Sequence, residues 1–455
     1  MKKNTSIKFC SGVGTVTGAN FLLETEKGTK VLVDCGLVQG EKVSEEINRE
    51  PFQYDLSSIT ALFITHAHLD HVGRIPKLVK DGFKGSIFST PQTKALAELV
   101  LNDAVTILTK EAKEDGLEPL YGEADVAAVF PLWKTIKYHE AFKLNDEVSV
   151  YFKDAGHILG SSMIEFTLGT IKVLFTGDLG NTPAPLLQDT EMVGDVDYLV
   201  MESVYGDRNH DDKEGRTNHF REIINRTMAR GGTLVIPAFS IDRTQILLYE
   251  LNNMVEKGMI QSVPVFVDSP MAIKATEVYA ANTDLFNVHA RAQIANGDDI
   301  FHFPRLEYTM SANDSRDIER MKGAKIILAG SGMSVGGRVI GHEAYYLPDE
   351  KSTILLVGYQ TTGSLGRRLA DGARKVHIHG QEVKVRAQIE TLYGYSAHKD
   401  SDHLVEFVST GNEKLKEVFV VMGEPGASMH LAQRVNDELG VKAIVPERGG
   451  SKDLV

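Results

Sequence analysis

Short apolar runs rich in Val, Ile, Leu and Phe recur along the chain, and segments of helical character separate them in its second half. Such runs are typical of buried strands. They lie at residues 59–64, 171–175, 197–201, 233–237, 263–267, 325–329 and 352–357. Because strands that alternate with helices form parallel sheets covered on both faces, the pattern predicts an α/β fold.

The run at 59–64 leads into a segment with a high density of ionisable side chains. A helix is predicted from Leu69 to Val79, ending near Gly82, and another covers 95–113. At the passage from strand to helix stand four potential metal ligands in six positions: His66, His68, Asp70 and His71.

These four side chains suit a metal site better than a surface loop that happens to be rich in histidine. His66 and His68 are two residues apart, so an extended or turning backbone points both imidazoles the same way. Asp70 and His71 follow on the turn into the helix and can face a second point nearby. Zinc favours neutral imidazole and carboxylate at about 2.0–2.2 Å, and a catalytic site leaves one position open for water.

Two later residues in matching contexts can complete such a site. His157 lies in DAGHILGS, where glycines let the backbone approach a centre closely. Asp178 follows the strand at 171–175 within TGD. Each is weak alone, because an Asp after a strand is more often a turn former or a helix cap. Together with the earlier run they predict a metal centre.

The residues around these candidate ligands resemble a known fold. HAHLDH, GHILGS around His157, FTGDLG around Asp178 and VDCG around Asp34 are similar to the motifs of the metallo-β-lactamase fold, a four-layer αββα sandwich with a metal site at one edge. The resemblance implies one zinc held by His66, His68, His157 and Asp178. It implies a second zinc held by Asp70, His71 and the shared Asp178. Asp34 would orient these ligands from behind.

Further motifs narrow the resemblance to one branch of that superfamily. Glu202 lies in MESVYGDR, and the other motifs are IPAFSIDRTQ at 236–245, VDSPMA at 267–272, LAGSGMSVGGRVIGH at 328–342 and GYSAH at 394–398. They resemble the β-CASP branch, whose members are nucleases, and most of all its RNA-cleaving group, which includes the eukaryotic pre-mRNA 3′-end endonuclease. The resemblance covers almost the whole chain and implies an inserted α/β β-CASP domain.

The positions of the motifs predict how the chain is divided. The metal ligands fall between residues 66 and 178, whereas His398 returns near the end, so the chain must leave the first fold and come back. At 455 residues two domains are expected. We expect the metallo-β-lactamase domain at 1–202, the β-CASP domain at 203–375 and the C-terminal part of the first domain at 376–455.

The predicted chemistry is metal-assisted hydrolysis of a phosphodiester bond. Zinc lowers the pKa of bound water toward about 7, and a metal pair can hold both the attacking oxygen and the phosphate. By resemblance, His398 is the general acid for the leaving oxygen or a donor to the phosphate, and Glu202 holds its imidazolium in place. A histidine at a helix N-terminus after a capping Ser396 is the alternative. The predicted catalytic residues are Asp70, His398 and Glu202.

A glycine-rich segment after the run at 325–329 is the candidate phosphate-binding loop. Its backbone amides and the following helix N-terminus can face an anion, and Arg338 would add a forked contact. The predicted phosphate-binding residues are Ser331, Gly332, Gly336, Gly337, Arg338 and Ser396. By contrast, Gly12, Gly14 and Gly18 miss the spacing of a dinucleotide-binding loop and predict a tight turn.

One position departs from the RNA-cleaving pattern. That group has a histidine before Gly-Glu about two dozen residues after the SAH motif, where this chain has Met422. A thioether is a poor ligand for zinc beside oxygen and imidazole donors, so we expect weaker or absent occupancy of the second site. The DNA-processing group, which includes Artemis, also has an apolar residue there. His403 and His430 are not placed to substitute.

Composition predicts a soluble intracellular enzyme. No apolar run approaches the roughly 18 residues of a membrane span, and the N-terminus lacks the apolar core of a secretory signal, so a cytoplasmic location is expected. Two cysteines, Cys10 and Cys35, fall in predicted early strands and are expected to be buried free thiols. A homodimer remains an open alternative for the assembly.

The net charge of −13 contrasts with the basic face usual in nucleic-acid-binding proteins. Local clusters exist, however, and beside the motifs lie Arg208, Arg243 and Arg386. A further cluster consists of Arg367, Arg368, Arg374 and Lys375. Whether it is a solvated helix face or a substrate contact stays open. No long basic tail is present, so base-specific readout is not expected.

We therefore predict a zinc-dependent ribonuclease acting on single-stranded RNA in RNA processing or decay. Two alternatives are a DNA nuclease of the same fold and a catalytically silent RNA-binding protein that lost turnover with its second zinc. The silent alternative is weakened by the presence of every other predicted ligand and catalytic residue, because decay of a site seldom stops at one ligand.

Overall fold

Two sheets of seven strands each form the part of the chain that carries the predicted metal ligands. One sheet has the order β22-β1-β2-β3-β4-β5-β6 and the other β21-β20-β11-β10-β9-β8-β7. The first contains β1 (Thr5–Ser11), β2 (Asn20–Glu24), β3 (Lys30–Val33), β4 (Ala61–Phe63), β5 (Ser86–Ser89), β6 (Trp133–Thr135) and β22 (Ser451–Leu454). The second contains β7 (Phe142–Lys143), β8 (Val148–Asp154), β9 (Ser162–Leu168), β10 (Ile171–Phe175), β11 (Tyr198–Met201), β20 (Glu417–Val420) and β21 (Lys442–Ile444).

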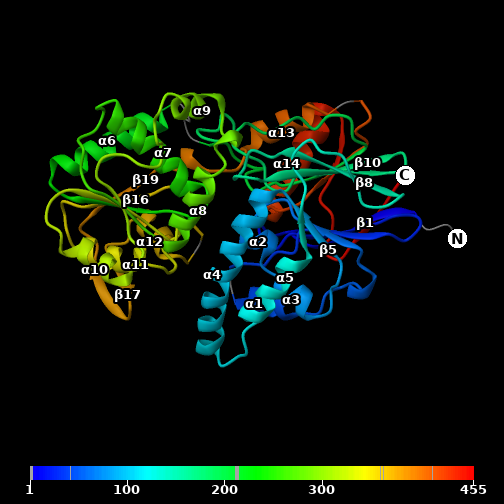
Figure 1. The fold of residues 1–455 in the computed structure, drawn as a ribbon, viewed down its shortest axis with the longest axis horizontal. Helices are drawn as coiled ribbons and strands as arrows, with labels where there is room; N and C mark the ends of the chain where they lie inside the picture. Colours follow the sequence, from blue (N-terminus) through cyan, green and yellow to red (C-terminus); the bar gives the residue numbers. More distant parts are fainter. Residues whose placement is uncertain (1–3, 41, 211–214, 359, 362, 412) are drawn as a thin grey trace. The chain divides into compact units, whose positions relative to one another are not determined.

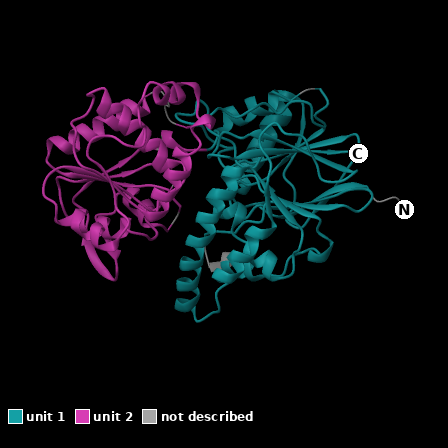
Figure 2. Cartoon of the chain, viewed as in Figure 1, with its two compact units in different colours: residues 1–209, 398–455 teal, residues 210–397 magenta. Residues whose placement is uncertain are grey.

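This computed structural model describes residues 4–40, 42–210, 215–358, 360–361, 363–411 and 413–455. The chain divides into two units, which are residues 1–209 with 398–455, and residues 210–397 (Figure 2).

The two sheets pack face to face because their strands alternate in polarity. Val148, Val150 and Phe152 of β8 are buried at every second position, as expected for a strand with one face in the core. They join one apolar cluster with residues of the other sheet. The rings of Phe63 on β4 and Phe166 on β9 meet edge to face at 5.2 Å. The shared core holds the loops at the sheet ends in a fixed geometry.

Helices cover the outer faces of both sheets, which confirms the predicted four-layer αββα sandwich (Figure 1). Beside the first sheet run α1 (Lys42–Arg49), α2 (Leu69–Val72), α3 (Ile75–Lys80), α4 (Pro91–Asp115) and α5 (Glu123–Val129). On the second sheet lie α13 (Ser401–Ser409) and α14 (Pro425–Leu439), whose apolar faces share a cluster with β10, β11 and β20.

The helix predicted from Leu69 to Val79 is in fact two short helices, α2 and α3. The N–H of Gly73 closes the last turn of α2 on Leu69. Pro76 stands in the first turn of α3, where its missing N–H is tolerated but would break a continuous helix.

Residues 210–397 form a second α/β unit around a six-stranded sheet in which every pair is parallel. The order is β14-β13-β15-β12-β16-β19. Its strands are β12 (Thr233–Pro237), β13 (Val265–Asp268), β14 (Leu306–Tyr308), β15 (Lys325–Ala329), β16 (Thr353–Leu356) and β19 (Gln388–Thr391). Its helices are α6 (Arg216–Ala229), α7 (Arg243–Glu256), α8 (Pro270–Ala280), α9 (Val288–Ala295), α10 (Ala312–Arg320), α11 (Val339–Tyr346) and α12 (Leu365–Ala370).

This unit is displaced from the expected insertion at 203–375. Residues before 210 belong to the first unit, where the Ser203 hydroxyl donates to the carbonyl of Val421 at 2.8 Å. At the other end, β19 extends the parallel sheet beside β16, and β17 (Lys375–Ile378) forms a hairpin with β18 (Gln381–Lys384). These later strands have few apolar residues, so the apolar pattern did not indicate them.

Two further expectations concern membranes and cysteines. Among the described residues, no helix is long and apolar enough to cross a bilayer. Cys10 lies in β1, whereas Cys35 follows the end of β3 instead of lying within a strand, and both are buried free thiols.

Candidate metal centre

Loops that follow β4, β8, β10 and β11 bring the predicted ligands together. Their ligand atoms form groups in which all atoms lie within 4.8 Å of one another. The groups are His66, His68, His157 and Asp178; Asp70, His71 and Asp178; and Asp178, Glu202 and His398. Asp178 belongs to each group, so its carboxylate is the centre of the arrangement.

The ligand atoms of the first group lie as close together as a shared metal ion requires. His68 Nδ1 lies 3.2 Å from His66 Nε2 and 3.2 Å from His157 Nε2. Asp178 Oδ2 lies 3.4 Å from His66 Nε2 and 3.6 Å from His157 Nε2. Zinc bonded tetrahedrally at about 2.0–2.1 Å separates its ligand atoms by roughly 3.3–3.4 Å. The four distances agree with that separation between the ligands of one zinc ion.

The ionisation of these side chains favours a metal ion at their centre. Burial, aided by neighbouring histidines, holds the pKa of His68 and of His157 well below the usual value, so both imidazoles are neutral and offer a lone pair. Burial opposes ionisation of Asp178, but His71 and His66 hold its pKa well below the usual range. Neutral imidazoles beside an ionised carboxylate are a donor set that suits zinc.

The second group contains buried polar atoms that the protein itself leaves unsatisfied. His71 Nε2 and Asp178 Oδ1 face each other as an ion pair at 3.3 Å, but within the part of the chain that the structure describes neither atom has a hydrogen-bond partner. Asp70 Oδ2 lies 3.8 Å from His71 Nε2. An unsatisfied buried polar atom is rare and costs about 1–3 kcal/mol. A metal ion bound here would satisfy both atoms, so these residues also fit a metal.

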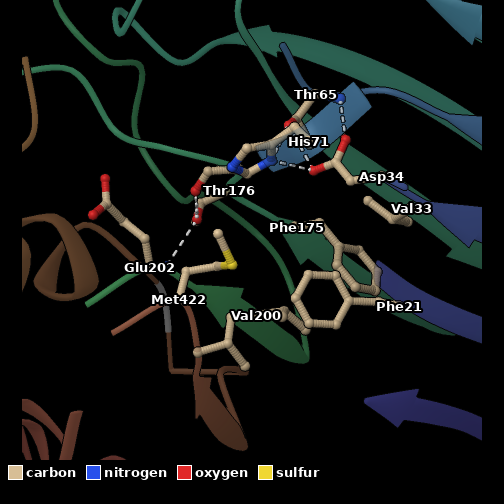
Figure 3. A pocket seen from close by; sticks show the side chains of 12 residues that line it. Phe21, Val33, Asp34, Thr65, His71, Phe175, Thr176, Val200, Glu202 and Met422 are labelled. Atoms are coloured by element: carbon tan, nitrogen blue, oxygen red, sulfur yellow. Dashed lines mark hydrogen bonds and ion pairs between the residues drawn. The ribbon is translucent and has the colours of Figure 1, made fainter. Parts of the chain in front are cut away.

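Asp34 holds the ring of His71 through Nδ1 (Figure 3), whereas Asp178 faces the other ring nitrogen, Nε2. One carboxylate oxygen, Oδ2, accepts from His71 Nδ1 at 2.7 Å and from the Thr65 hydroxyl at 2.8 Å. The other, Oδ1, accepts from the Thr65 backbone N–H at 2.8 Å. With Nδ1 protonated, His71 Nε2 is left as the ligand atom. Sequence reasoning missed Thr65, although it directly precedes His66.

His398 and Glu202 form a hydrogen-bonded pair beside Asp178. Glu202 Oε1 accepts from His398 Nδ1 at 3.1 Å and from the backbone N–H of Leu179 at 2.6 Å. Burial lowers the pKa of His398, but the Glu202 carboxylate outweighs it, and the pKa is raised to about 9. The imidazole is therefore protonated at neutral pH, with its second ring nitrogen, Nε2, not used by Glu202.

Glycines allow the ligand loops to approach one another closely. A Cβ on Gly180 would lie 1.9 Å from the carbonyl oxygen of Gly156, so no side chain fits between the loops of His157 and Asp178. The hydroxyl oxygen of Ser161 accepts from the backbone N–H of His157 at 3.0 Å. Ser161 is a second supporting residue that sequence reasoning did not single out.

Known families match this chain along most of its length. The Metallo-beta-lactamase superfamily matches residues 13–199, the Beta-Casp domain residues 244–369, and the Zn-dependent metallo-hydrolase RNA specificity domain residues 382–446. The chain is 34% identical over 393 residues to Ribonuclease TTHA0252 of Thermus thermophilus, covering 86% of this chain and 88% of that one. It belongs to the β-CASP branch of the metallo-β-lactamase superfamily.

Other similarities agree with this membership. Transcription termination factor FttA of Pyrococcus horikoshii is 31% identical over 448 residues, covering 94% of this chain and 68% of that protein. FttA of Methanosarcina mazei is 30% identical, covering 96% and 69%. A protein of unknown function from Enterococcus faecalis, known from a crystal structure, has the same fold with a TM-score of 0.55 at 14% identity, covering 99% of this chain and 100% of that chain. The β-CASP family is one of metal-dependent hydrolases, in line with the ligand groups above.

Met422 lies beside the second ligand group of this β-CASP protein. It is 2% exposed, and its backbone N–H donates to the carbonyl of Gly12 at 2.8 Å. Together with apolar side chains of the sandwich core, it lines a cavity of about 10 Å³ that also borders His71 and Glu202 (Figure 3). Such a volume is about enough for one water molecule. The thioether thus offers only a soft neutral donor at this place.

The predicted phosphate-binding loop, between β15 and α11 of the β-CASP unit, is closed by its own hydrogen bonds. The N–H of Ser331 donates to the carbonyl of Gly336 at 3.2 Å, and the Ser331 hydroxyl accepts from the N–H of Val335 at 3.0 Å. The N–H of Val339 donates to the carbonyl of Gly330 at 3.0 Å. The loop therefore keeps its shape and brings together Ser331, Gly332, Gly336 and Gly337.

Arg338 differs from its expected role, because its guanidinium is used inside the unit. Its Nη1 donates to Asp268 Oδ1 at 2.6 Å and to the carbonyl of Thr309 at 3.0 Å, and its Nη2 donates to the carbonyl of Met310 at 2.5 Å. Asp268 is fully buried and also accepts from His342 Nε2 at 2.7 Å. A buried carboxylate needs such partners, so Arg338 anchors the loop instead of offering a free fork to phosphate.

Ser396 does not cap the helix that follows His398. The side chain of Asp400 has that role, accepting from the N–H of His403 at 3.2 Å, and α13 begins only at Ser401. Ser396 is buried and lies in the β-CASP unit, whereas the metal ligands lie in the other unit.

The candidate basic cluster is partly neutralised. Arg367 Nε donates to Asp371 at 2.9 Å, and Lys375 pairs with Glu382 at 2.9 Å. Arg368 and Arg374 are exposed. These two ion pairs are typical of a solvated surface, while the exposed Arg368 and Arg374 stay candidates for a substrate contact.

Proposed function

We propose that this protein is a zinc-dependent ribonuclease that hydrolyses phosphodiester bonds of single-stranded RNA. The observation that carries the proposal is the group of His66, His68, His157 and Asp178, whose ligand atoms lie 3.2–3.6 Å apart and fit a zinc ion. The β-CASP membership and the relative named a ribonuclease add the substrate class.

In this proposal each of two ligand groups binds one zinc ion. The first zinc is held by His66, His68, His157 and Asp178, and a second by Asp70, His71 and Asp178. Zinc, when bound, supplies a nucleophilic water at neutral pH and neutralises the charge that develops on the phosphate. Asp70 has a catalytic role besides, because its carboxylate orients the attacking water. Asp34 fixes the ring of His71 and so keeps the second group in shape.

His398 delivers a proton to the leaving oxygen. Its Nδ1 donates to Glu202, so the proton available to substrate is the one on Nε2. The raised pKa of about 9 keeps that proton on the ring at neutral pH. Glu202 is itself held by the backbone N–H groups of Leu179 and Val204, so the imidazolium cannot rotate away.

The second zinc binds more weakly than the first. Its group has one imidazole and two carboxylates, and the neighbouring Met422 adds no donor of matching hardness. A DNA nuclease with the same centre is the alternative favoured by this residue.

The test combines metal analysis with cleavage. We would determine zinc per chain in protein purified without added metal, and follow cleavage of end-labelled single-stranded RNA and of DNA of the same sequence, before and after chelation. Chelator-sensitive cleavage of RNA over DNA is expected. Preferential cleavage of DNA would contradict the ribonuclease proposal and support a DNA nuclease. If the protein binds zinc and RNA but cleaves neither strand, it is a silent RNA-binding protein.

A further inference from the structure

The connections of the β-CASP sheet reverse direction between β12 and β15. These strands are neighbours. From β12 the chain passes β15 to reach β13, whereas from β15 it passes β12 to reach β16. In an open parallel sheet, ligands bind outside the carboxyl ends of the strands at the place where the connections reverse. Here the two loops at that place are Ala238–Asp242 and Gly330–Arg338.

Exposed apolar side chains gather at this edge of the sheet. The described residues of the unit include six large hydrophobic side chains that are exposed: Phe239, Val288, Met310, Met321, Val335 and Tyr345. Three of them lie in loops that follow the carboxyl ends of strands, Phe239 after β12, Met310 after β14 and Val335 in the longer loop after β15. Single exposed apolar residues are ordinary, but a gathering at the ligand-binding edge of a sheet is typical of a binding surface.

Phe239 is held rigidly while 42% of it is exposed. Its carbonyl accepts from both the N–H and the hydroxyl of Thr244, at 3.2 and 2.8 Å, in the first turn of α7. Its ring packs on the backbone of Gly332, where an added Cβ would lie 2.6–2.9 Å from ring atoms. The ring therefore connects the loop after β12 with the loop after β15 and presents a fixed apolar surface.

Hydroxyl groups stand beside this ring. The hydroxyls of Ser240 and Ser269 lie 3.2 Å apart, and a Cβ on Gly330 would lie 3.6 and 3.5 Å from them. Hydroxyls both donate and accept, so they can bind a ribose or a phosphate oxygen. An aromatic surface next to such groups is the arrangement on which proteins stack the bases of single strands with little sequence preference.

From this arrangement we infer that the loops after β12 and β15 bind one nucleotide of single-stranded RNA, with its base stacked on Phe239 and its sugar or phosphate on the hydroxyl of Ser240. The inference rests on the proposed ribonuclease function, because that function supplies the ligand. It adds a substrate contact in the β-CASP unit to those of the metal centre.

Fluorescence tests binding without cleavage. The single Trp of the chain, Trp133, is 3% exposed, so it gives a constant background. In the full-length Phe239→Trp protein, with metal removed, oligouridylate is expected to quench the new emission. The matched control is Tyr345→Trp, at an exposed aromatic position in α11, whose emission should stay unchanged. Unquenched emission of Phe239→Trp under conditions where RNA is bound would overturn the inference.

Kinetics give the second readout. Phe239→Ala is expected to raise KM for a single-stranded RNA about tenfold with little change in kcat, Phe239→Trp to restore it, and Tyr345→Ala to have no effect. An RNA with one abasic position should reproduce the defect in the wild type and add nothing to it in Phe239→Ala. If all variants cleave RNA with equal KM, the proposed nucleotide contact at Phe239 is wrong, whereas the proposed ribonuclease function is supported. If RNA quenches the emission of Phe239→Trp but is not cleaved, the nucleotide contact is supported and the ribonuclease function is wrong. If RNA is neither bound nor cleaved, both proposals are wrong.

Discussion

The metal centre and the carboxyl edge of the β-CASP sheet differ in the burial of their side chains and in the kind of polar groups that they contain. At the centre the side chains of His66, His71 and Asp178 are at most 4% exposed, and each polar atom faces another. At the edge, Phe239 is 42% and Val335 67% exposed, and the polar groups are backbone and hydroxyls. Buried ionisable groups are costly unless every partner is present, whereas an exposed edge can lose a side chain without disturbing its neighbours.

The difference teaches where substitutions act on the proposed reaction. Changes at the centre remove metal and chemistry together, because one carboxylate serves every ligand group. Changes at the edge alter only how firmly substrate is held. The following predictions test this division.

Asp178→Asn should have the largest effect. An amide keeps the shape but removes the charge that faces His66 and His71, so zinc content should fall and RNA cleavage should drop by about a thousandfold or more. Elemental analysis and end-labelled RNA measure both. The control, Asp195→Asn, removes a surface ion pair with Lys414 and should change neither. Retained zinc and activity would show that Asp178 is not the shared ligand.

His398→Ala should separate chemistry from metal binding within the centre. Loss of the proton donor is expected to slow cleavage about 10²- to 10⁴-fold while zinc stays bound. The matched control is His403→Ala. It removes a histidine of α13 that is hydrogen-bonded to Asp400, and this variant should cleave RNA at the normal rate. An unchanged rate in His398→Ala would remove this residue from the mechanism.

Met422→His should change only the second group. The backbone of Met422 has a φ of +48°, which histidine tolerates better than most residues, and the side chain lines the same cavity as His71. We expect zinc affinity of the second group to rise about tenfold or more, as measured by competition with a chelator. Met422→Leu adds no donor and should leave the affinity unchanged. No difference between the two variants would mean that position 422 lies out of reach of the metal.

The local sequence predicted the buried strands and the short metal-ligand motif, because neighbouring residues alone determine both. The strands at 171–175, 233–237 and 325–329 appear with the predicted bounds, because a continuous apolar run specifies a buried strand. His66 to His71 form one short motif, so their common location needed no knowledge of the fold. The pairing of His398 with Glu202, 196 residues apart, came from family resemblance and not from spacing.

What the sequence did not predict depends on contacts between distant segments. Arg338 stands after a glycine-rich loop, as a phosphate ligand would, but its partner Asp268 is 70 residues away on a neighbouring strand. Phe239 gave no signal as a surface residue, because its exposure follows from the order of β12 and β15 in the sheet. Likewise, β19 joins the sheet by backbone pairing with β16 and not by apolar side chains.

Replacing the buried thiols should have the smallest effect on RNA cleavage. They are buried like the metal ligands, but burial alone does not make a group functional. Burial raises the pKa of both Cys10 and Cys35 to about 12, so at pH 8 a disulfide reagent should label neither thiol in the native protein and both after unfolding.

The same shift predicts that stability depends on pH in the alkaline range. Above the ordinary thiol pKa of 9.0 the unfolded chain loses thiol protons that the native chain keeps, so stability to urea should fall between pH 9 and pH 12, by about 1.4 kcal/mol per pH unit and thiol. In the Cys10→Ala, Cys35→Ala double variant this fall should be smaller, with zinc content unchanged. Zinc loss in that variant would instead place a thiol near the metal, and the separation of centre from surroundings drawn above would fail.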